Sequence, residues 1–153
     1  MAKSYDQMVF RISSHATSVS IALLVLRLIA GSAFIHHGWQ KIQNPLGWMG
    51  PQSSIPGFLQ LLAAISEFGG GICWVLGLMT PLAALGIAST MTGAVYYHSI
   101  VRKDPFVNLT GGPSYELALV FLGVALLFLV LGPGKISLDR ILFGERTEKG
   151  IRL

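Results

Sequence analysis

Two ionisable side chains lie inside long apolar stretches of the sequence. Arg27 lies in the run 19–34, and Glu67 lies near the centre of the run 58–78. A charged group at the middle of a bilayer costs roughly 3 kcal/mol on insertion scales, so such groups usually face protein and are paired or functional. We predict that Arg27 and Glu67 pair across two helices, with Arg27 holding Glu67 ionised and Glu67 exchanging protons. A purely structural clamp between the helices is the alternative.

Further polar side chains are predicted to gather above this pair. His37 and Lys41 follow the first apolar run. His98 ends the third run, and Glu116 opens the fourth. Imidazole can exchange protons near neutral pH, and an acidic residue in the first turn of a helix complements the helix dipole. We predict that Lys41, His37 and His98 bind a cofactor, and that Glu116 is a second catalytic carboxylate.

Metal and haem chemistry are less favoured. His37 and His98, from two helices, could in principle hold one haem, but the sequence lacks the repeated histidine pairs that two haems would need. Cys73 is the single cysteine, which excludes an internal disulfide and any Cys-x-x-Cys motif for zinc binding or thiol redox chemistry. No metal site is predicted.

Four apolar segments must position these side chains. They lie at 19–38, 57–78, 81–100 and 115–132, and each is close to the ~20 residues that a helix needs to cross a bilayer. Pro81 suits the first turn of a helix, so the second and third segments are predicted to form a tight antiparallel hairpin. A short interfacial segment is expected at 137–143. The sequence therefore predicts an all-α integral membrane four-helix bundle, with one domain at 19–143.

The composition agrees with a membrane protein. Hydrophobic residues make up 52% of the chain and charged residues only 12%, with 18 glycines in 153 residues. The formal charge of +4 does not indicate a nucleic-acid partner, because the basic residues form no dense stripe. The expected surroundings are lipid.

Basic residues predict how the helices are oriented. Both chain ends fall on the same side of four spans. Seven of the 11 Lys and Arg residues flank that side, namely Lys3, Arg11, Lys135, Arg140, Arg146, Lys149 and Arg152. The other side has Lys41, Arg102 and Lys103. Because cytoplasmic flanks carry the excess of Lys and Arg, segment 1–18 and the tail 144–153 are predicted to be cytoplasmic.

Small residues accompany the buried charges on each helix face. At 100° per residue, Arg27, Gly31 and Gly38 share one face of the first segment. One face of the second segment carries Gln60, Ala63, Ala64, Glu67, Gly70, Gly71 and Trp74. Small residues let membrane helices approach closely, so Glu67 is predicted to face protein rather than lipid.

Several short motifs resemble those of DoxX-like integral membrane proteins. They are LRLIAG at 26–31, HGWQK at 37–41, SEFGGG at 66–71, LGLMTP at 76–81, GPSYE at 112–116 and GPGKISLD at 132–139. The resemblance covers about residues 20–143. Arg27, Lys41, Glu67 and Glu116 all lie within these motifs.

The resemblance implies a role in quinone chemistry. DoxX-like proteins take their name from a subunit of an archaeal terminal quinol oxidase, and related chains are assigned to thiosulfate oxidation with quinone as acceptor. Because the sequence has no flavin, nicotinamide or iron–sulfur motif, we expect quinone as the cofactor and a redox partner protein or a homo-oligomer. The expected location is the cytoplasmic (inner) membrane of a bacterium or archaeon. A non-enzymatic scaffold or assembly factor and a small-solute transporter are the alternatives.

Overall fold

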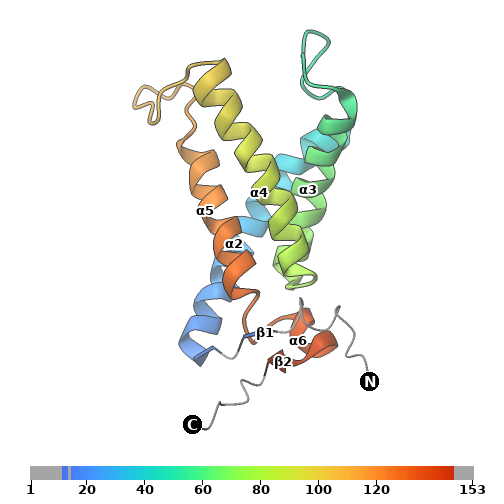
Figure 1. The fold of residues 1–153 in the computed structure, drawn as a ribbon, viewed down its shortest axis with the longest axis vertical. Coiled ribbons are helices and arrows are strands. Elements are labelled where there is room, and N and C mark those ends of the chain that lie inside the picture. The colour runs from blue at the N-terminus through green and yellow to red at the C-terminus, as the bar shows by residue number, and fades with distance from the viewer. Residues whose placement is uncertain (1–11, 14, 147–153) are drawn as a thin grey trace, which may run out of the picture.

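The structure is a computed structural model that describes residues 12, 13 and 15–146. Four long helical stretches account for most of it (Figure 1). These are α2 (Thr17–Ile42), α3 (Gly57–Leu76), α4 (Thr80–Tyr96) with its π-helical continuation η1 (Tyr97–Val101), and α5 (Glu116–Leu131). A short helix, α6 (Leu138–Phe143), and a two-residue parallel pairing of β1 (Ile12–Ser13) with β2 (Glu145–Arg146) complete the fold.

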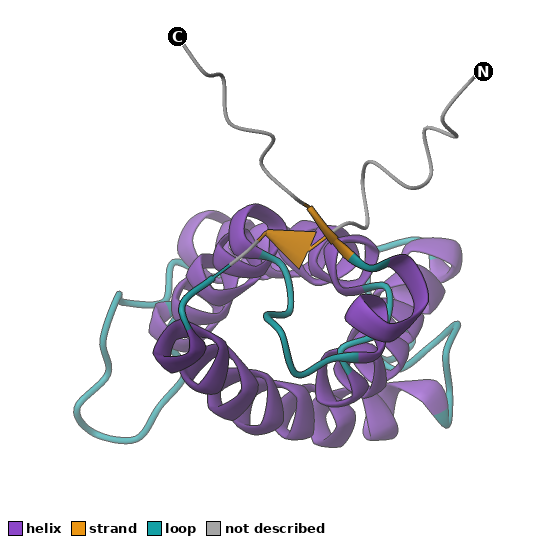
Figure 2. Ribbon diagram, turned by 90° about the horizontal axis from the view of Figure 1, so that it is seen from below, coloured by secondary structure: helices purple, strands orange, loops and turns teal. Residues whose placement is uncertain are grey.

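The helices run side by side and form an oval ring when seen along their length (Figure 2). Neighbours in the sequence are neighbours in space, because α2 packs on α3, α3 on α4 and α4 on α5. The connections 43–56 and 102–115 lie at one end, which we call the loop end, whereas α6 and the strand pair lie at the other (Figure 1). The all-helical prediction is confirmed for the described residues apart from the strand pair.

The first helix is longer than predicted. Its apolar run was expected to end at residue 38, but α2 continues to Ile42. Tertiary contacts with α3 explain the extension. A Cβ on Gly38 would clash with the backbone of Phe68, and the side chain of Lys41 pairs with that of Glu67. Packing therefore keeps a polar turn helical.

A tight hairpin joins α3 to α4, as predicted. Gly77 ends α3 in the left-handed region at φ 65°, where glycine is favoured. Met79 is also left-handed at φ 47°, and a proline begins α4. Asp139 of α6 caps this hairpin. Its carboxylate accepts hydrogen bonds from the backbone N of Met79 at 2.6 Å and of Thr80 at 2.9 Å.

The helices expose much apolar surface. Examples are Ile29, Leu62, Leu85 and Val130, each more than half exposed. By length and composition α2 and α3 are each able to cross a membrane, and α5 is a shorter apolar helix of 16 residues. The described part of the chain therefore has the outward apolar surface of a membrane protein. Residues 1–11, 14 and 147–153, which include most of the two expected cytoplasmic segments, lie outside the described residues.

Candidate functional site

A buried ion pair joins α2 to α3. The Glu67 side chain is 1% exposed, and its carboxylate oxygen Oε1 pairs with Lys41 Nζ. The Gly38 contact with Phe68 brings the two helices close enough for this pairing. Lys41 Nζ also lies 4.5 Å from the centroid of the Trp48 ring, a cation–π contact. The prediction that Glu67 faces protein is confirmed, and its partner is Lys41.

The predicted pairing of Glu67 with Arg27 is wrong. The antiparallel register of α2 and α3 sets Gly31 against Gly71, where a Cβ on either would come within 2.8 Å of the other's carbonyl oxygen. Arg27 lies about one turn earlier and contacts Gly77. Glu67 is therefore about ten residues away along α3, or roughly 15 Å. The apolar runs placed both residues near the middle of a span, but the register separates them.

Arg27 belongs to a different polar cluster, at the end opposite the loops. Its Nη2 donates a 2.7 Å hydrogen bond to the carbonyl oxygen of Ile136, and Asp139 is a carboxylate that interacts with it electrostatically. Arg27 is 1% exposed and Asp139 0%. Sequence reasoning placed Asp139 only in an interfacial segment, although its position in the GPGKISLD motif was a usable signal.

A cavity of about 1090 Å³ lies between α3 and α4, with walls from α2, α5 and the loops. Lys41, His37, His98 and Glu67 all line it. The three residues predicted to bind a cofactor therefore share one space with the buried carboxylate. Glu116 is exposed and, like Arg27, does not line this cavity.

The cavity exists because α3 and α4 separate toward the loop end. Near their middle they are in contact, since a Cβ on Gly70 would lie 3.0 Å from Ile87, and one on Gly86 would lie 3.0 Å from Ser66 Oγ. One on Gly93, two turns further along α4, would meet nothing within 4 Å. Exposed side chains of both helices, such as Leu62 and Leu85, also line the cavity. It therefore opens sideways, onto apolar surface, and its lining extends along the two helices as far as Met79 at the hairpin.

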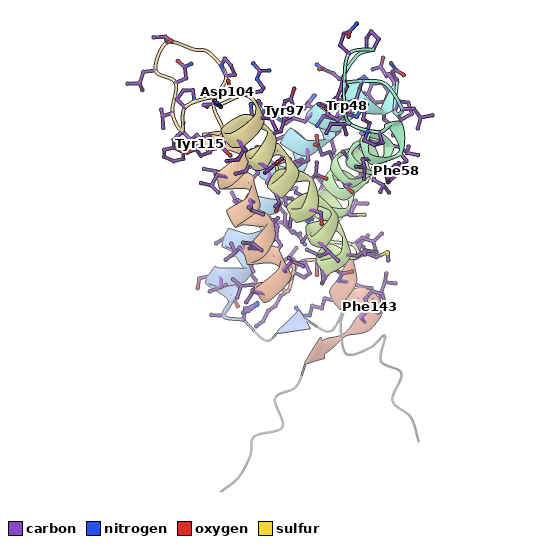
Figure 3. All side chains as sticks on the ribbon, turned by 45° about the horizontal axis from the view of Figure 1, so that its top comes forward. Trp48, Phe58, Tyr97, Asp104, Tyr115 and Phe143 are labelled. Atoms are coloured by element: carbon purple, nitrogen blue, oxygen red, sulfur yellow. The ribbon has the colours of Figure 1, made fainter. Side chains whose placement is uncertain are left out.

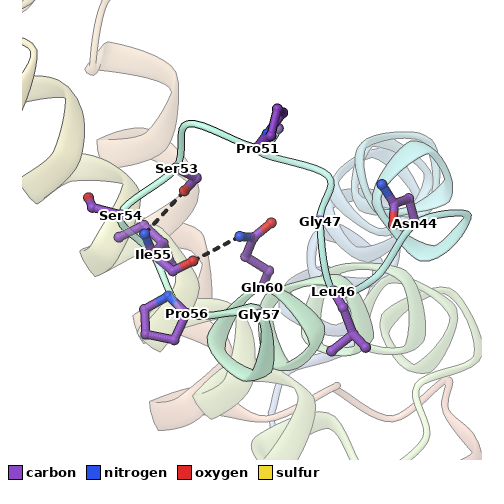
Figure 4. Close-up of a pocket in the computed structure, with 11 residues that line it drawn as sticks. Asn44, Leu46, Gly47, Pro51, Ser53, Ser54, Ile55, Pro56, Gly57 and Gln60 are labelled. Carbon is purple, nitrogen blue, oxygen red and sulfur yellow. Dashed lines mark hydrogen bonds between the residues drawn. The ribbon is translucent and has the colours of Figure 1, made fainter.

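The loop 43–56 holds Trp48 over the ion pair. Trp48 Nε1 donates to the carbonyl oxygen of Gln60 at 3.0 Å, and the Gln60 side chain accepts from Met49 N at 3.0 Å and donates to the Ile55 carbonyl oxygen at 2.9 Å. Figure 4 shows Gln60 inside a separate hollow of about 550 Å³ that this loop encloses. That hollow has no charged side chain in its wall. The hydrogen bonds of Gln60 to Met49 and Ile55 hold the loop in place.

His98 lies on η1 at the cavity wall. Its Nδ1 is 2.7 Å from Asp104 Oδ2, and Arg102 Nε is 3.1 Å from the same oxygen. Tyr97 and Asp104 lie at the loop end of α4, across from Trp48 (Figure 3). Asp104 was missed at the sequence level because nothing local marks a loop aspartate as a histidine partner.

The arrangement suits proton exchange with an apolar ligand. The cavity combines a cation, a buried carboxylate and an imidazole with largely apolar walls.

Among the described residues no group of three or more His, Cys, Asp or Glu side chains could hold a metal ion.

Comparisons with known proteins agree with the motifs. The DoxX family model matches residues 22–99, more than half of the chain. The Escherichia coli "Inner membrane protein YqjF" is 33% identical over 128 residues, which is 80% of this chain and 92% of that protein. The Bacillus subtilis "Putative oxidoreductase CatD" is 30% identical over 128 residues, 82% of this chain and 90% of that protein. No solved structure matches the chain. The chain therefore belongs to the DoxX family of membrane proteins.

Proposed function

We propose that this protein is the membrane component of a quinone-linked oxidoreductase and that the cavity between α3 and α4 binds the quinone head group. The carrying observation is the convergence of the Lys41–Glu67 ion pair and His98 on one largely apolar cavity. A quinone has an apolar ring and tail and two carbonyl oxygens. Lys41 would donate to one oxygen, and His37 or His98 would interact with the other.

The proposed membrane arrangement has four spans. α4 and η1 together form a continuous helix from Thr80 to Val101, long enough to cross the hydrocarbon. Both chain ends would be cytoplasmic, since the excess of Lys and Arg lies at that side. The polar part of the cavity wall, with Lys41 and His98, would then lie in the outer half of the bilayer of an inner membrane. Its sideways opening would let a lipid-soluble quinone enter between α3 and α4.

The proposed chemistry needs an electron-carrying partner. Reduction of a quinone takes two electrons and two protons and gives a hydroquinone, and oxidation is the reverse. Glu67 and His98 would transfer protons, and Glu116 would exchange protons at the exposed loop end. A partner protein with a flavin or metal centre would supply or accept the electrons. The printed name of the Bacillus subtilis relative, which includes "oxidoreductase", supports this class of activity.

Arg27 has a positioning role in this proposal. It lies at the end of the molecule opposite the loops and does not line the cavity. Together with Asp139 it would fix the α3–α4 hairpin, and so fix where the two helices separate. In this proposal Arg27 and Asp139 form a structural clamp, whereas Glu67 and Lys41 form part of the ligand site.

Bound quinone is the direct test. We expect protein purified in mild detergent to yield a quinone on organic extraction and mass spectrometry. The double variant Lys41→Gln/Glu67→Gln removes both charges together, so that neither is left buried alone, and should lose most of the quinone while remaining folded. Lys103→Gln, a cation in the loop 102–115 that does not line the cavity, is the matched control and should retain it.

Turnover gives a second readout when it is measured in native membranes, which retain the electron-carrying partner. Glu67→Gln keeps a hydrogen-bonding group of the same shape but cannot exchange protons, so it should slow quinone reduction at least tenfold without loss of bound quinone. Failure of the wild-type protein to bind any quinone, extracted or added, would sink the proposal and favour a scaffold or transporter. Loss of protein accumulation in Glu67→Gln would instead point to a structural pair.

A further inference from the structure

Besides the Lys41–Glu67 pair, a second group of charged or ionisable side chains lies at the cavity wall. Its three residues all come from the segment 98–104. His98 and Arg102 both contact a single oxygen, Asp104 Oδ2. The backbone reinforces this arrangement, because Asp104 N donates a 2.8 Å hydrogen bond to the His98 carbonyl oxygen. The Asp104 side chain is 11% exposed, so most of it is shielded from solvent. The group is a fixed unit rather than a chance surface contact.

Hydrogen-bond chemistry decides which nitrogen of His98 carries the proton. An ionised carboxylate only accepts hydrogen bonds, and Asp104 Oδ2 also faces the Arg102 guanidinium, which only donates. His98 Nδ1 must therefore be the donor in the 2.7 Å contact. In a neutral imidazole with hydrogen on Nδ1, Nε2 has a free lone pair and can only accept.

We infer that Asp104 is a positioning residue that presents His98 Nε2 to the cavity as a hydrogen-bond acceptor, and that the site thereby prefers a ligand with a hydroxyl group. This inference rests on the proposed quinone site. Within a quinone pair only the hydroquinone has a hydroxyl hydrogen to donate, whereas the quinone has carbonyl oxygens that can only accept. His98 therefore favours binding of the hydroquinone over binding of the quinone.

The opposite wall is compatible with the same ligand. Lys41 Nζ donates to Glu67 and is 21% exposed on its side chain, so it can also donate to a ligand oxygen. A hydroquinone oxygen accepts hydrogen bonds as well as donating one. Lys41 does not distinguish the two redox forms, because both offer an acceptor oxygen. Discrimination is thus assigned to His98 and Asp104.

The test compares the two redox forms of one ligand on the full chain. Equilibrium dialysis in mild detergent under argon would measure binding of a decyl-benzohydroquinone and its benzoquinone. We expect the wild-type protein to bind the hydroquinone about fivefold more tightly, the effect of one neutral hydrogen bond. Asp104→Asn should reduce this preference, because an amide no longer fixes the tautomer and the form with hydrogen on Nε2 can donate to a benzoquinone oxygen.

Two further variants make the result specific. Lys103→Asn changes a charge in the same loop and tolerates the left-handed backbone there, φ 58°, so it should keep the preference. Asp104→Glu should restore part of it. Nitrogen NMR of labelled histidine, assigned with His98→Gln, should show hydrogen on Nδ1 in the wild type and a mixture of tautomers in Asp104→Asn.

The outcomes separate the two proposals. Equal binding of both forms by wild type and Asp104→Asn would overturn the role of Asp104 while leaving the quinone site intact. Hydrogen on Nε2 of His98 in the wild type would overturn it as well. Binding of neither form would overturn the quinone site and this inference together.

Discussion

At the scale of single residues, each buried carboxylate is satisfied by groups from another element. Glu67 and Asp139 are both almost fully buried. Lys41 of α2 neutralises Glu67, and two backbone N–H groups of the α3–α4 hairpin bind Asp139. Because desolvating a carboxylate has a large cost unless it is paired and hydrogen-bonded, these contacts decide whether the helices can pack.

Asp139 offers a prediction for stability. Asp139→Ala removes both hydrogen bonds to the hairpin and leaves Arg27 buried without a nearby carboxylate. Removing one partner of a buried charge typically costs about 3–5 kcal/mol, so we expect a clear fall in the thermal unfolding midpoint in detergent. Ile141→Ala, an exposed position of the same short helix, is the control. Equal midpoints for the two variants would contradict this role of Asp139.

At the scale of helices, glycines set how closely α2 and α3 approach. The run of three glycines at 69–71 contains a position where a Cβ would clash with α2 and a position where it would meet nothing. A Cβ on Gly71 would lie 2.7 Å from Ile35 N and 2.8 Å from the Gly31 carbonyl oxygen, whereas one on Gly69 would meet nothing within 4 Å. Contacts to backbone atoms cannot relax by a side-chain rotation. Only part of a uniform glycine motif is therefore required for packing.

This contrast predicts opposite effects of the same substitution at neighbouring positions. Gly71→Ala should push α2 away from α3 and destabilise the protein by about 1–3 kcal/mol, as overpacking does. Gly69→Ala should be neutral or stabilise it by up to about 1 kcal/mol, because alanine favours helix more than glycine does. Unfolding of the two variants under identical detergent conditions checks this. Similar losses in both would show that the α2–α3 distance is not set at Gly71.

At the scale of the whole molecule, the two ends differ in their polar contacts. The end with α6 holds Arg27 and Asp139 and ties α6 to the α3–α4 hairpin. Toward the loop end lie the polar part of the cavity wall, with the Lys41–Glu67 pair, and His98. The separation of α3 and α4 above Gly86 creates the space between them. A closely packed end and a more open end thus follow from one change in helix separation.

The proposed orientation predicts which end can be labelled from outside. In a Cys73→Ala background, Leu109→Cys in the loop 102–115, where the side chain is 95% exposed, should react with a membrane-impermeant maleimide on intact spheroplasts. Ile141→Cys on α6, also exposed, should react only after permeabilisation. The reverse pattern would place the chain ends outside and invert the proposed topology.

The sequence by itself determined the helical segments, the buried faces of α2 and α3, and the position of the hairpin. Gln60, Glu67 and Gly70 share a face by local periodicity, and burial confirms it. Only the tertiary structure decided which charges meet. Glu67 pairs with Lys41 rather than Arg27 because the register between two helices depends on contacts between glycines distant in sequence. Helical periodicity determines which way a residue faces, but it does not determine which residue lies opposite.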